Sequence, residues 1–210
     1  MEDVLDVYQR PYDVKRPVVC IDEATKELHS TPRPQTAARQ STVQRQDYEY
    51  QREGTRNLFL RVEPLTGNVG VHVTERRTSV DFAEELRRLV DVDYPDADQV
   101  VLVTDNLNTH NTACLYEAFA PEEAQRIAKR IEWHFTPEHA SWLNMAEIEL
   151  SVLSRQCLAR RIPDAATLIS EVAAWQTTRN AEPVKINWQF RATDARIKLR
   201  HLYPERKSSR

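Results

Sequence analysis

Two aspartates each end a short run of apolar residues. Asp22 closes the run "VVCID", and Asp105 closes the run "VLVTD". Continuous apolar runs of this length are typical of strands that are buried in the centre of a sheet. In an open α/β sheet, functional groups gather beyond the carboxyl ends of the parallel strands. Either aspartate alone is more simply explained as a turn cap, but two of them on strands that can be neighbours indicate a shared site.

Two neighbouring carboxylates need a cation. Ionised carboxylates side by side repel each other, which raises a pKa unless a cation lies between them. Mg²⁺ takes oxygen ligands, and one or two carboxylates typically hold it while substrate phosphates complete its shell. The two aspartates therefore favour a magnesium site.

A third ligand is predicted in "SWLNMAEIEL", which places Glu147 and Glu149 on one helix. At about 100° per residue, two apolar stripes run along this helix, and Glu147 lies outside both. It shares its face with Ser151 and Ser154, whose small side chains leave room for a metal or a substrate. Glu149 falls between the stripes, where a salt bridge or partial exposure is the easier explanation. We therefore choose Glu147, although without the aspartates a solvated helix face would explain both glutamates.

The rest of the chain alternates predicted strands with predicted helices. Strands are predicted at 18–21, 57–63, 69–75, 99–104 and 132–135, and helices at 79–90, 114–119, 121–131, 141–158, 164–179 and 193–203. The second and third strands bracket Pro64–Asn68, which is a hairpin signature. The order β-β-β-α-β-α-β-α predicts an α/β fold with a mixed sheet flanked by helices, in which the two most hydrophobic strands are parallel and central. Only three glycines are present, so a Gly-rich phosphate loop is not expected.

Three segments carry a resemblance to a known family: "VVCIDE", "VTDNLNTH" and "HFTPEHASWLNMAEIELSVLSRQCL". They resemble the DDE-superfamily transposases of bacterial insertion sequences, in the insertion sequence 630 branch that is related to mariner elements. The resemblance spans nearly the whole chain, and its third motif is the most specific. It implies a ribonuclease H-like fold, DNA strand cleavage followed by strand transfer, and two Mg²⁺ ions for which Mn²⁺ can substitute. Matching the motifs places the acidic triad at Asp22, Asp105 and Glu147, in agreement with the helix-face argument.

Further polar residues flank the triad. The candidates for orienting phosphates or metal-bound water are Asn106, Asn108, His110, His139 and Asn144. For the two histidines, structural hydrogen bonding within the loop is an equally good explanation. Trp142 can stack on a base, but a position in the core or at its rim is more usual for a tryptophan that opens an amphipathic helix.

The net charge of −3 hides an asymmetry. Residues 150–210 hold 12 Lys/Arg and 5 Asp/Glu, a balance of +7 that leaves −10 for the rest of the chain. A second basic region lies between Thr31 and Arg61. From charge alone a solvated surface with a disordered tail is the ordinary explanation, whereas the resemblance implies that DNA is the partner. The residues we expect to contact DNA are Arg33, Arg39, Arg45, Arg191, Arg196, Lys198 and Arg200.

The resemblance also sets expectations for the organisation of the chain. We expect a ribonuclease H-like catalytic domain at 1–180, with a basic mobile loop at 29–46, and a basic C-terminal segment with a short helix at 181–210. Complete transposases of this kind carry N-terminal helix-turn-helix modules, and here the first aspartate already stands at residue 22, so we expect that module to be absent. A homodimer is implied because two DNA ends must be brought together. Two alternatives stay open: a DNA-binding remnant without productive activity, and a ribonuclease H-like nuclease that acts on RNA–DNA hybrids.

No apolar run approaches the about 20 residues of a membrane helix, and the N-terminus lacks the apolar stretch of a signal peptide. The three cysteines are scattered through apolar runs, as expected of buried reduced thiols. We therefore expect a bacterial cytoplasmic protein, associated with the nucleoid when it binds DNA, and no membrane partner.

Overall fold

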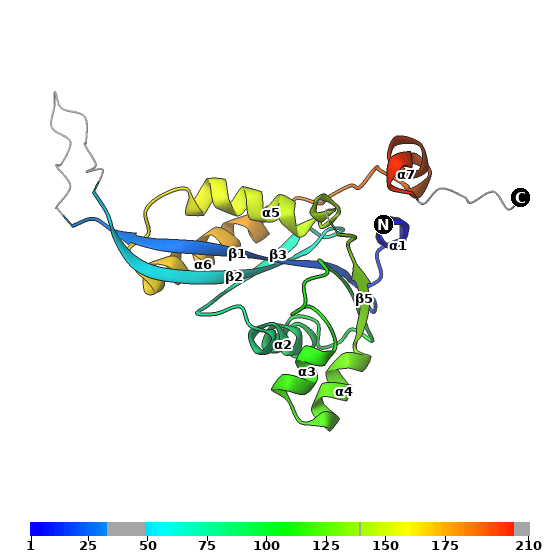
Figure 1. The fold of residues 1–210 in the computed structure, drawn as a ribbon, viewed down its shortest axis with the longest axis horizontal. Helices are drawn as coiled ribbons and strands as arrows, with labels where there is room; N and C mark the ends of the chain where they lie inside the picture. The colour runs from blue at the N-terminus through cyan, green and yellow to red at the C-terminus, as the bar shows by residue number, and fades with distance from the viewer. Residues whose placement is uncertain (33–48, 139, 204–210) are drawn as a thin grey trace, which may run out of the picture.

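A mixed five-stranded sheet forms the centre of the protein (Figure 1), in the spatial order β3-β2-β1-β4-β5. The computed structural model describes residues 1–32, 49–138 and 140–203. The strands are β1 (Val18–Ser30), β2 (Gln51–Glu63), β3 (Asn68–Thr74), β4 (Val100–Thr104) and β5 (Ile131–Phe135). The α-helices are α1 (Glu2–Val7), α2 (Ser79–Arg88), α3 (Ala113–Ala118), α4 (Pro121–Lys129), α5 (Ala146–Leu153), α6 (Ala165–Ala181) and α7 (Ala192–Lys198). The α/β class and the mixed sheet predicted from the sequence are confirmed.

The pairing of β1 decides where the site residues lie. On one side β1 pairs in parallel with β4, with Cys20 opposite Val103, and on the other it pairs antiparallel with β2, with Cys20 opposite Val62. The two most hydrophobic strands are therefore parallel neighbours in the middle of the sheet, as the sequence predicts. The carboxyl end of β4 lies beside Ile21 and Asp22, partway along β1.

Helices cover the sheet on both faces (Figure 1). Side chains alternate between faces along a strand, so β1 contributes Val18 and Cys20 to one core and Val19 and Ile21 to the other. The first core also contains buried residues of α1, α5 and α6, and the second contains those of α2, α3 and α4. Phe82 of α2 is fully buried in the second core.

The β1–β2 ribbon is longer than the sequence pattern predicts. The antiparallel ladder continues from Asp22 to Ser30, which pairs with Gln51 across an irregularity between Glu27 and His29. In the outer part of this ribbon, β2 is exposed from Gln51 to Thr55, and β1 is a mixture of half-buried and exposed residues apart from the buried Leu28, so the sequence lacks the continuous apolar run by which a buried strand is recognised. The loop predicted at 29–46 was therefore wrong at its start, because His29 and Ser30 belong to β1. The part of that loop from residue 33 onward lies outside the described residues.

The helix predicted at 141–158 is divided into three pieces. A 3₁₀ turn at Ser141–Leu143 precedes α5, and a π-helical turn at Ser154–Leu158 follows it. The break lies at Asn144, whose backbone is extended and whose side-chain Oδ1 accepts a hydrogen bond from the Ala146 N–H at 3.1 Å. Asn144 thus supplies the acceptor that the first turn of α5 needs.

The two ends of the described chain lie beside each other. α7 packs against α1, a six-residue helix that the sequence pattern did not predict, and Arg196 of α7 forms an ion pair with Glu2 at 2.6 Å. The expected C-terminal helix is therefore present, as α7 followed by a 3₁₀ turn at Arg200–Leu202. No helix among the described residues is long and apolar enough to cross a membrane.

Candidate active site

Asp22 and Asp105 lie at the same level of two neighbouring parallel strands. Cys20 of β1 is the register partner of Val103 of β4, and each aspartate stands two residues further along its strand direction. Paired strands are about 4.8 Å apart, so this register alone places the two backbones side by side at the carboxyl edge of the sheet. Asp22 and Asp105 are both half-buried.

The electrostatics of Asp22 show that the predicted triad residues are close to one another. Burial and the negative charges of Glu147, Asp105 and Glu23 raise the pKa of Asp22 from 3.8 to about 7, against the opposing effect of a hydrogen bond from the Glu23 N–H. Repulsion among carboxylates is the condition that a bound cation relieves. Asp105 and Glu147 are therefore both within electrostatic range of Asp22.

The two glutamates of α5 have different environments. Glu147 is exposed, whereas the side chain of Glu149 is only 2% exposed and forms a bidentate ion pair with Arg179 of α6, at 2.6 and 2.9 Å. The salt bridge that the helix pattern predicts for Glu149 is thus present. Its carboxylate is occupied by Arg179, and the Glu147 carboxylate is the one that acts on the pKa of Asp22.

Asn144 connects α5 to the end of β1. Its Nδ2 donates to the backbone oxygen of Ile21 at 2.8 Å and to Asp22 Oδ2 at 3.3 Å. The same side chain caps α5, so one buried residue ties the helix that carries Glu147 to the strand that carries Asp22. Asn144 is therefore placed to position two of the three acids.

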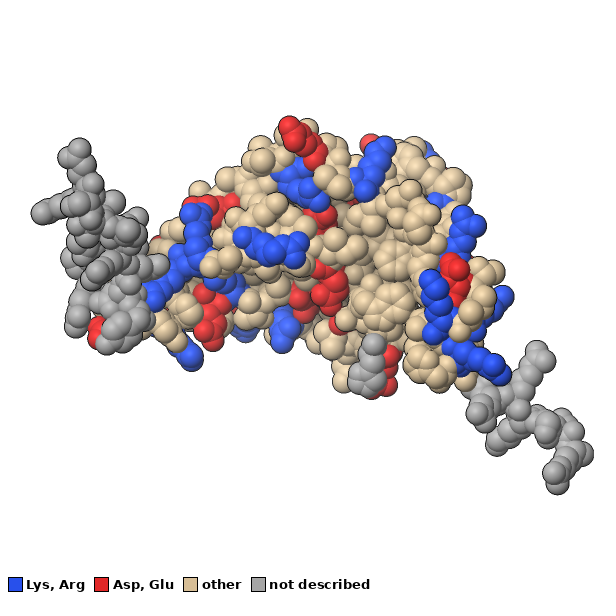
Figure 2. Space-filling model, turned by 90° about the horizontal axis from the view of Figure 1, so that it is seen from above, with Lys and Arg blue, Asp and Glu red and all other residues tan. Residues whose placement is uncertain are grey.

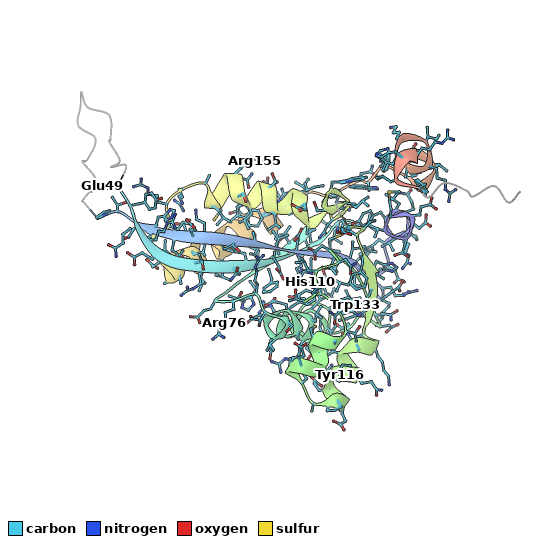
Figure 3. The ribbon with its side chains drawn as sticks, viewed as in Figure 1. Glu49, Arg76, His110, Tyr116, Trp133 and Arg155 are labelled. Carbon is cyan, nitrogen blue, oxygen red and sulfur yellow. The ribbon has the colours of Figure 1, made fainter. Side chains whose placement is uncertain are left out.

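His110 lies beneath Asp105, between the sheet and α2 (Figure 3). Its Nδ1 hydrogen-bonds Asp105 Oδ1, and its Nε2 lies 2.7 Å from Glu23 Oε1. Glu23 was not predicted as a site residue, because its partner is 87 positions away in the chain. The signal that could have found it is its place directly after Asp22 in "VVCIDE", at the end of a buried strand.

The other supporting candidates differ in their placement. Asn106 is exposed and lines, together with Asp105 and Ser141, a hollow of about 410 Å³ beside the aspartate. Asn108 is exposed in the same loop, and its backbone oxygen accepts a hydrogen bond from Asn111 Nδ2 at 2.6 Å. His139 lies outside the described residues. Trp142 is 45% exposed and stacks on Trp188 at a ring-centroid distance of 6.4 Å, so it lies at the rim of the core.

The three acids fit a hard divalent cation by chemistry. Their donor atoms are all carboxylate oxygens, the ligands that Mg²⁺ and Mn²⁺ prefer, and the raised pKa of Asp22 records the repulsion that such an ion would relieve. Among the described residues, however, no three His, Cys, Asp or Glu side chains are already gathered around one point as a metal site would require. The charges of Asp105 and Glu147 affect the pKa of Asp22, but the three side chains do not surround a common point.

Basic side chains lie at both ends of the face formed by α5 and α7 (Figure 2). Of the predicted DNA contacts, Arg191, Lys198 and Arg200 are exposed in or beside α7, whereas Arg196 is paired with Glu2. The other three, Arg33, Arg39 and Arg45, lie outside the described residues. Sequence reasoning missed Arg155, which lies eight residues after Glu147 in the π-helical turn that follows α5 (Figure 3) and donates to Ser151 Oγ at 2.6 Å.

The fold and the site define a class: a ribonuclease H-like sheet with carboxylates at the ends of its central parallel strands. Residues 17–169 match the family described as DDE superfamily endonuclease. The chain belongs to this family. A search of curated proteins returned no match.

Solved structures of the Mos1 mariner transposase share the fold. The Mos1 mariner paired end complex with Mn matches with a TM-score of 0.55 at 15% identity, over 83% of this chain and 52% of that one. The Mos1 strand transfer complex matches with a TM-score of 0.55 at 15% identity, over 85% of this chain and 51% of that one. The mariner Mos1 paired end complex with Mg matches with a TM-score of 0.54 at 14% identity, over 86% of this chain and 53% of that one. This chain therefore spans about half the length of the Mos1 chains. The predicted ribonuclease H-like fold is confirmed.

Proposed function

We propose that this chain is the catalytic core of a DDE transposase, which cuts DNA strands and transfers them during movement of an insertion sequence. The observation that carries the proposal is the shared level of Asp22 and Asp105 on neighbouring parallel strands, with Glu147 within electrostatic range of Asp22. Membership of the DDE superfamily endonucleases supports it. The Mos1 transposase, a protein of the same fold, is known as a paired end complex and as a strand transfer complex, which supports the same class of reaction for this chain.

Asp22, Asp105 and Glu147 would hold two Mg²⁺ ions in this proposal, and Mn²⁺ would substitute for them. Two ions at such a site activate water or a DNA 3′-hydroxyl as nucleophile and stabilise the oxygen that leaves. The chain itself supplies the placement: Asn144 keeps Asp22 in register with α5, and His110 holds one oxygen of Asp105. Asn106, which lines the hollow beside Asp105, is positioned to contact a phosphate there. Asn108 and His139 remain candidates for the same role.

We propose that the basic residues of the 181–210 segment and of the 29–46 region neutralise DNA phosphates. Exposed Lys and Arg side chains contribute most of the sequence-independent affinity of such proteins. In this division, residues 1–180 form the catalytic domain and the C-terminal segment contacts the DNA backbone. The active complex is proposed to be a homodimer that joins two DNA ends, in the cytoplasm of a bacterium.

The test is nicking of a supercoiled plasmid in Mn²⁺ or Mg²⁺ and in EDTA. We expect metal-dependent nicking by the wild type and its loss in Asp105→Ala. Wild-type activity in Asp105→Ala would remove that residue from the site. Two further results would replace the proposed function: cleavage of an RNA–DNA hybrid in preference to duplex DNA indicates a ribonuclease H-like nuclease, and DNA binding without any cleavage indicates a binding remnant.

A further inference from the structure

Asp22 and Glu23 are consecutive on β1 and have different neighbours. Asp22 contacts Asn144, at the start of α5, and Glu23 contacts His110, which stacks on Phe82 of α2 at a ring-centroid distance of 4.1 Å. Because alternate residues of a strand face opposite sides of the sheet, Glu23 cannot join Asp22 as a ligand on the α5 side. Its carboxylate is nevertheless almost completely buried, with 5% of the side chain exposed.

The partner of Glu23 is a histidine that reaches the site. The His110 side chain is fully buried, and its two ring nitrogens face two different carboxylates, Glu23 Oε1 at 2.7 Å and Asp105 Oδ1. Both ring nitrogens are thus held by carboxylate oxygens, so the orientation of the ring is fixed from two sides. Of the described side chains, His110 is the one that hydrogen-bonds the Asp105 carboxylate.

We propose that Glu23 is a positioning residue: through His110 it holds the Asp105 carboxylate in place from the opposite face of the sheet. The inference rests on the proposed function, in which Asp105 is a metal ligand. Asp105 lies beyond the last residue of β4, where the sheet ladder no longer fixes the chain. Contact at Oδ1 fixes the direction of the carboxylate and leaves Oδ2 for the metal.

The Glu23 carboxylate matters because it fixes the ring of His110 in the orientation that turns Nδ1 toward Asp105. Without a partner at Nε2, the ring can rotate, and its Nδ1 loses contact with Asp105 Oδ1. Partners that orient metal ligands from outside the coordination shell typically contribute 10–100-fold to metal affinity or activity. A merely structural role would instead affect only the stability of the fold.

The chain contains a matched control. His134 of β5 is also buried between two carboxylates, with Nδ1 2.7 Å from Asp3 Oδ2 and Nε2 2.9 Å from Glu132 Oε1. None of these three residues belongs to the predicted triad. Replacing His134 therefore removes an arrangement of the same kind that is not connected to Asp105.

The experiment is an Mn²⁺ titration of the full chain, followed by the EPR signal of free Mn²⁺, together with urea unfolding in EDTA. We expect Glu23→Ala to weaken Mn²⁺ binding by about 10–100-fold, and His110→Ala at least as much. His110→Asn should be the milder of the two histidine variants, because its amide can donate from the position of Nδ1. His134→Asn should lower stability and leave Mn²⁺ binding unchanged.

The outcomes separate this inference from the proposed function. If Asp105→Asn abolishes Mn²⁺ binding while Glu23→Ala and His110→Ala bind like the wild type, the positioning role is overturned and the function stands. If the wild type itself binds no Mn²⁺, the proposed function fails, and the inference with it. Should these variants not fold, Glu23→Asp decides, because its shorter side chain withdraws the carboxylate from His110: weaker Mn²⁺ binding supports the bridge, and wild-type binding overturns it.

Discussion

The two glutamates of α5 should respond in opposite ways to the same substitution. Glu149→Gln leaves the guanidinium of Arg179 facing a neutral amide in a site where that side chain is only 16% exposed. Removing one partner of a buried ion pair costs about 3–5 kcal/mol, because the other charge stays buried and uncompensated. Since Arg179 retains some contact with water, we expect a loss of about 2–4 kcal/mol in the free energy of unfolding.

Glu147→Gln should have the reverse effect. Glu147 is exposed, and it adds to the repulsion at Asp22, so the variant should be at least as stable as the wild type. It should nevertheless lose metal-dependent cleavage, which Glu149→Gln should retain at temperatures where it is folded. Urea unfolding in EDTA and plasmid nicking in Mn²⁺ measure the two quantities on the same preparations.

The crossed result would refute the assignment of the third acid. If Glu149→Gln abolishes cleavage while remaining folded, and Glu147→Gln cleaves normally, the ligand is Glu149 and the helix-face argument is wrong. The double variant Glu149→Gln/Arg179→Gln is the control for the ion pair. It should recover part of the stability lost by Glu149→Gln, because no charge is then left unpaired.

Two further predictions concern Asp22 and Arg155. Burial and the neighbouring acids raise the pKa of Asp22 from 3.8 to about 7. The folded state therefore holds this proton more tightly than the unfolded state, and the free energy of unfolding falls as pH rises from about 4 to 7. Urea unfolding in EDTA should therefore show that Asp22→Asn is more stable than the wild type by about 1–3 kcal/mol at pH 8. At pH 4 the two proteins should differ little, and a variant that is less stable than the wild type at pH 8 would contradict this reasoning. Arg155→Ala should weaken DNA binding and reduce the slope of log affinity against log salt by about 1. Arg126→Ala is its control, because Arg126 lies on α4 and is paired with Asp91 and Glu123; equal effects of the two variants would remove Arg155 from the interface.

The central strands and the positions of the two aspartates on them could be predicted because their signals are local. Each aspartate ends a buried apolar run, and the choice of Glu147 over Glu149 follows from the angular positions of residues on one helix. The register of β1 against β4 then follows from burying both runs at the same depth. The predictions that depend on such runs are confirmed by the sheet order and the parallel pairing.

Features set by long-range packing were not predictable in the same way. The outer β1–β2 ribbon is polar on both sides and carries no hydrophobic pattern. α1 has only six residues, too few for a helical period, and it is fixed by burying Val4, Leu5 and Val7 against the sheet. The break at Asn144 depends on an acceptor in β1, the backbone oxygen of Ile21, which is 123 positions away.

Glu23 shows how one strand can serve two sides of a site. A shift of one residue in the register of β1 would exchange the faces of Asp22 and Glu23, and would also move Val18 and Cys20 out of their core. The packing of Val18 and Cys20 in one core and of Val19 and Ile21 in the other therefore fixes the placement of the acids that follow. Asp22 then faces α5, which carries Glu147, and Glu23 faces His110, which hydrogen-bonds Asp105. The two consecutive acids therefore interact with two different carboxylates of the site from opposite faces of the sheet. In the proposed site, the same register gives Asp22 the role of a ligand and Glu23 that of a positioning residue.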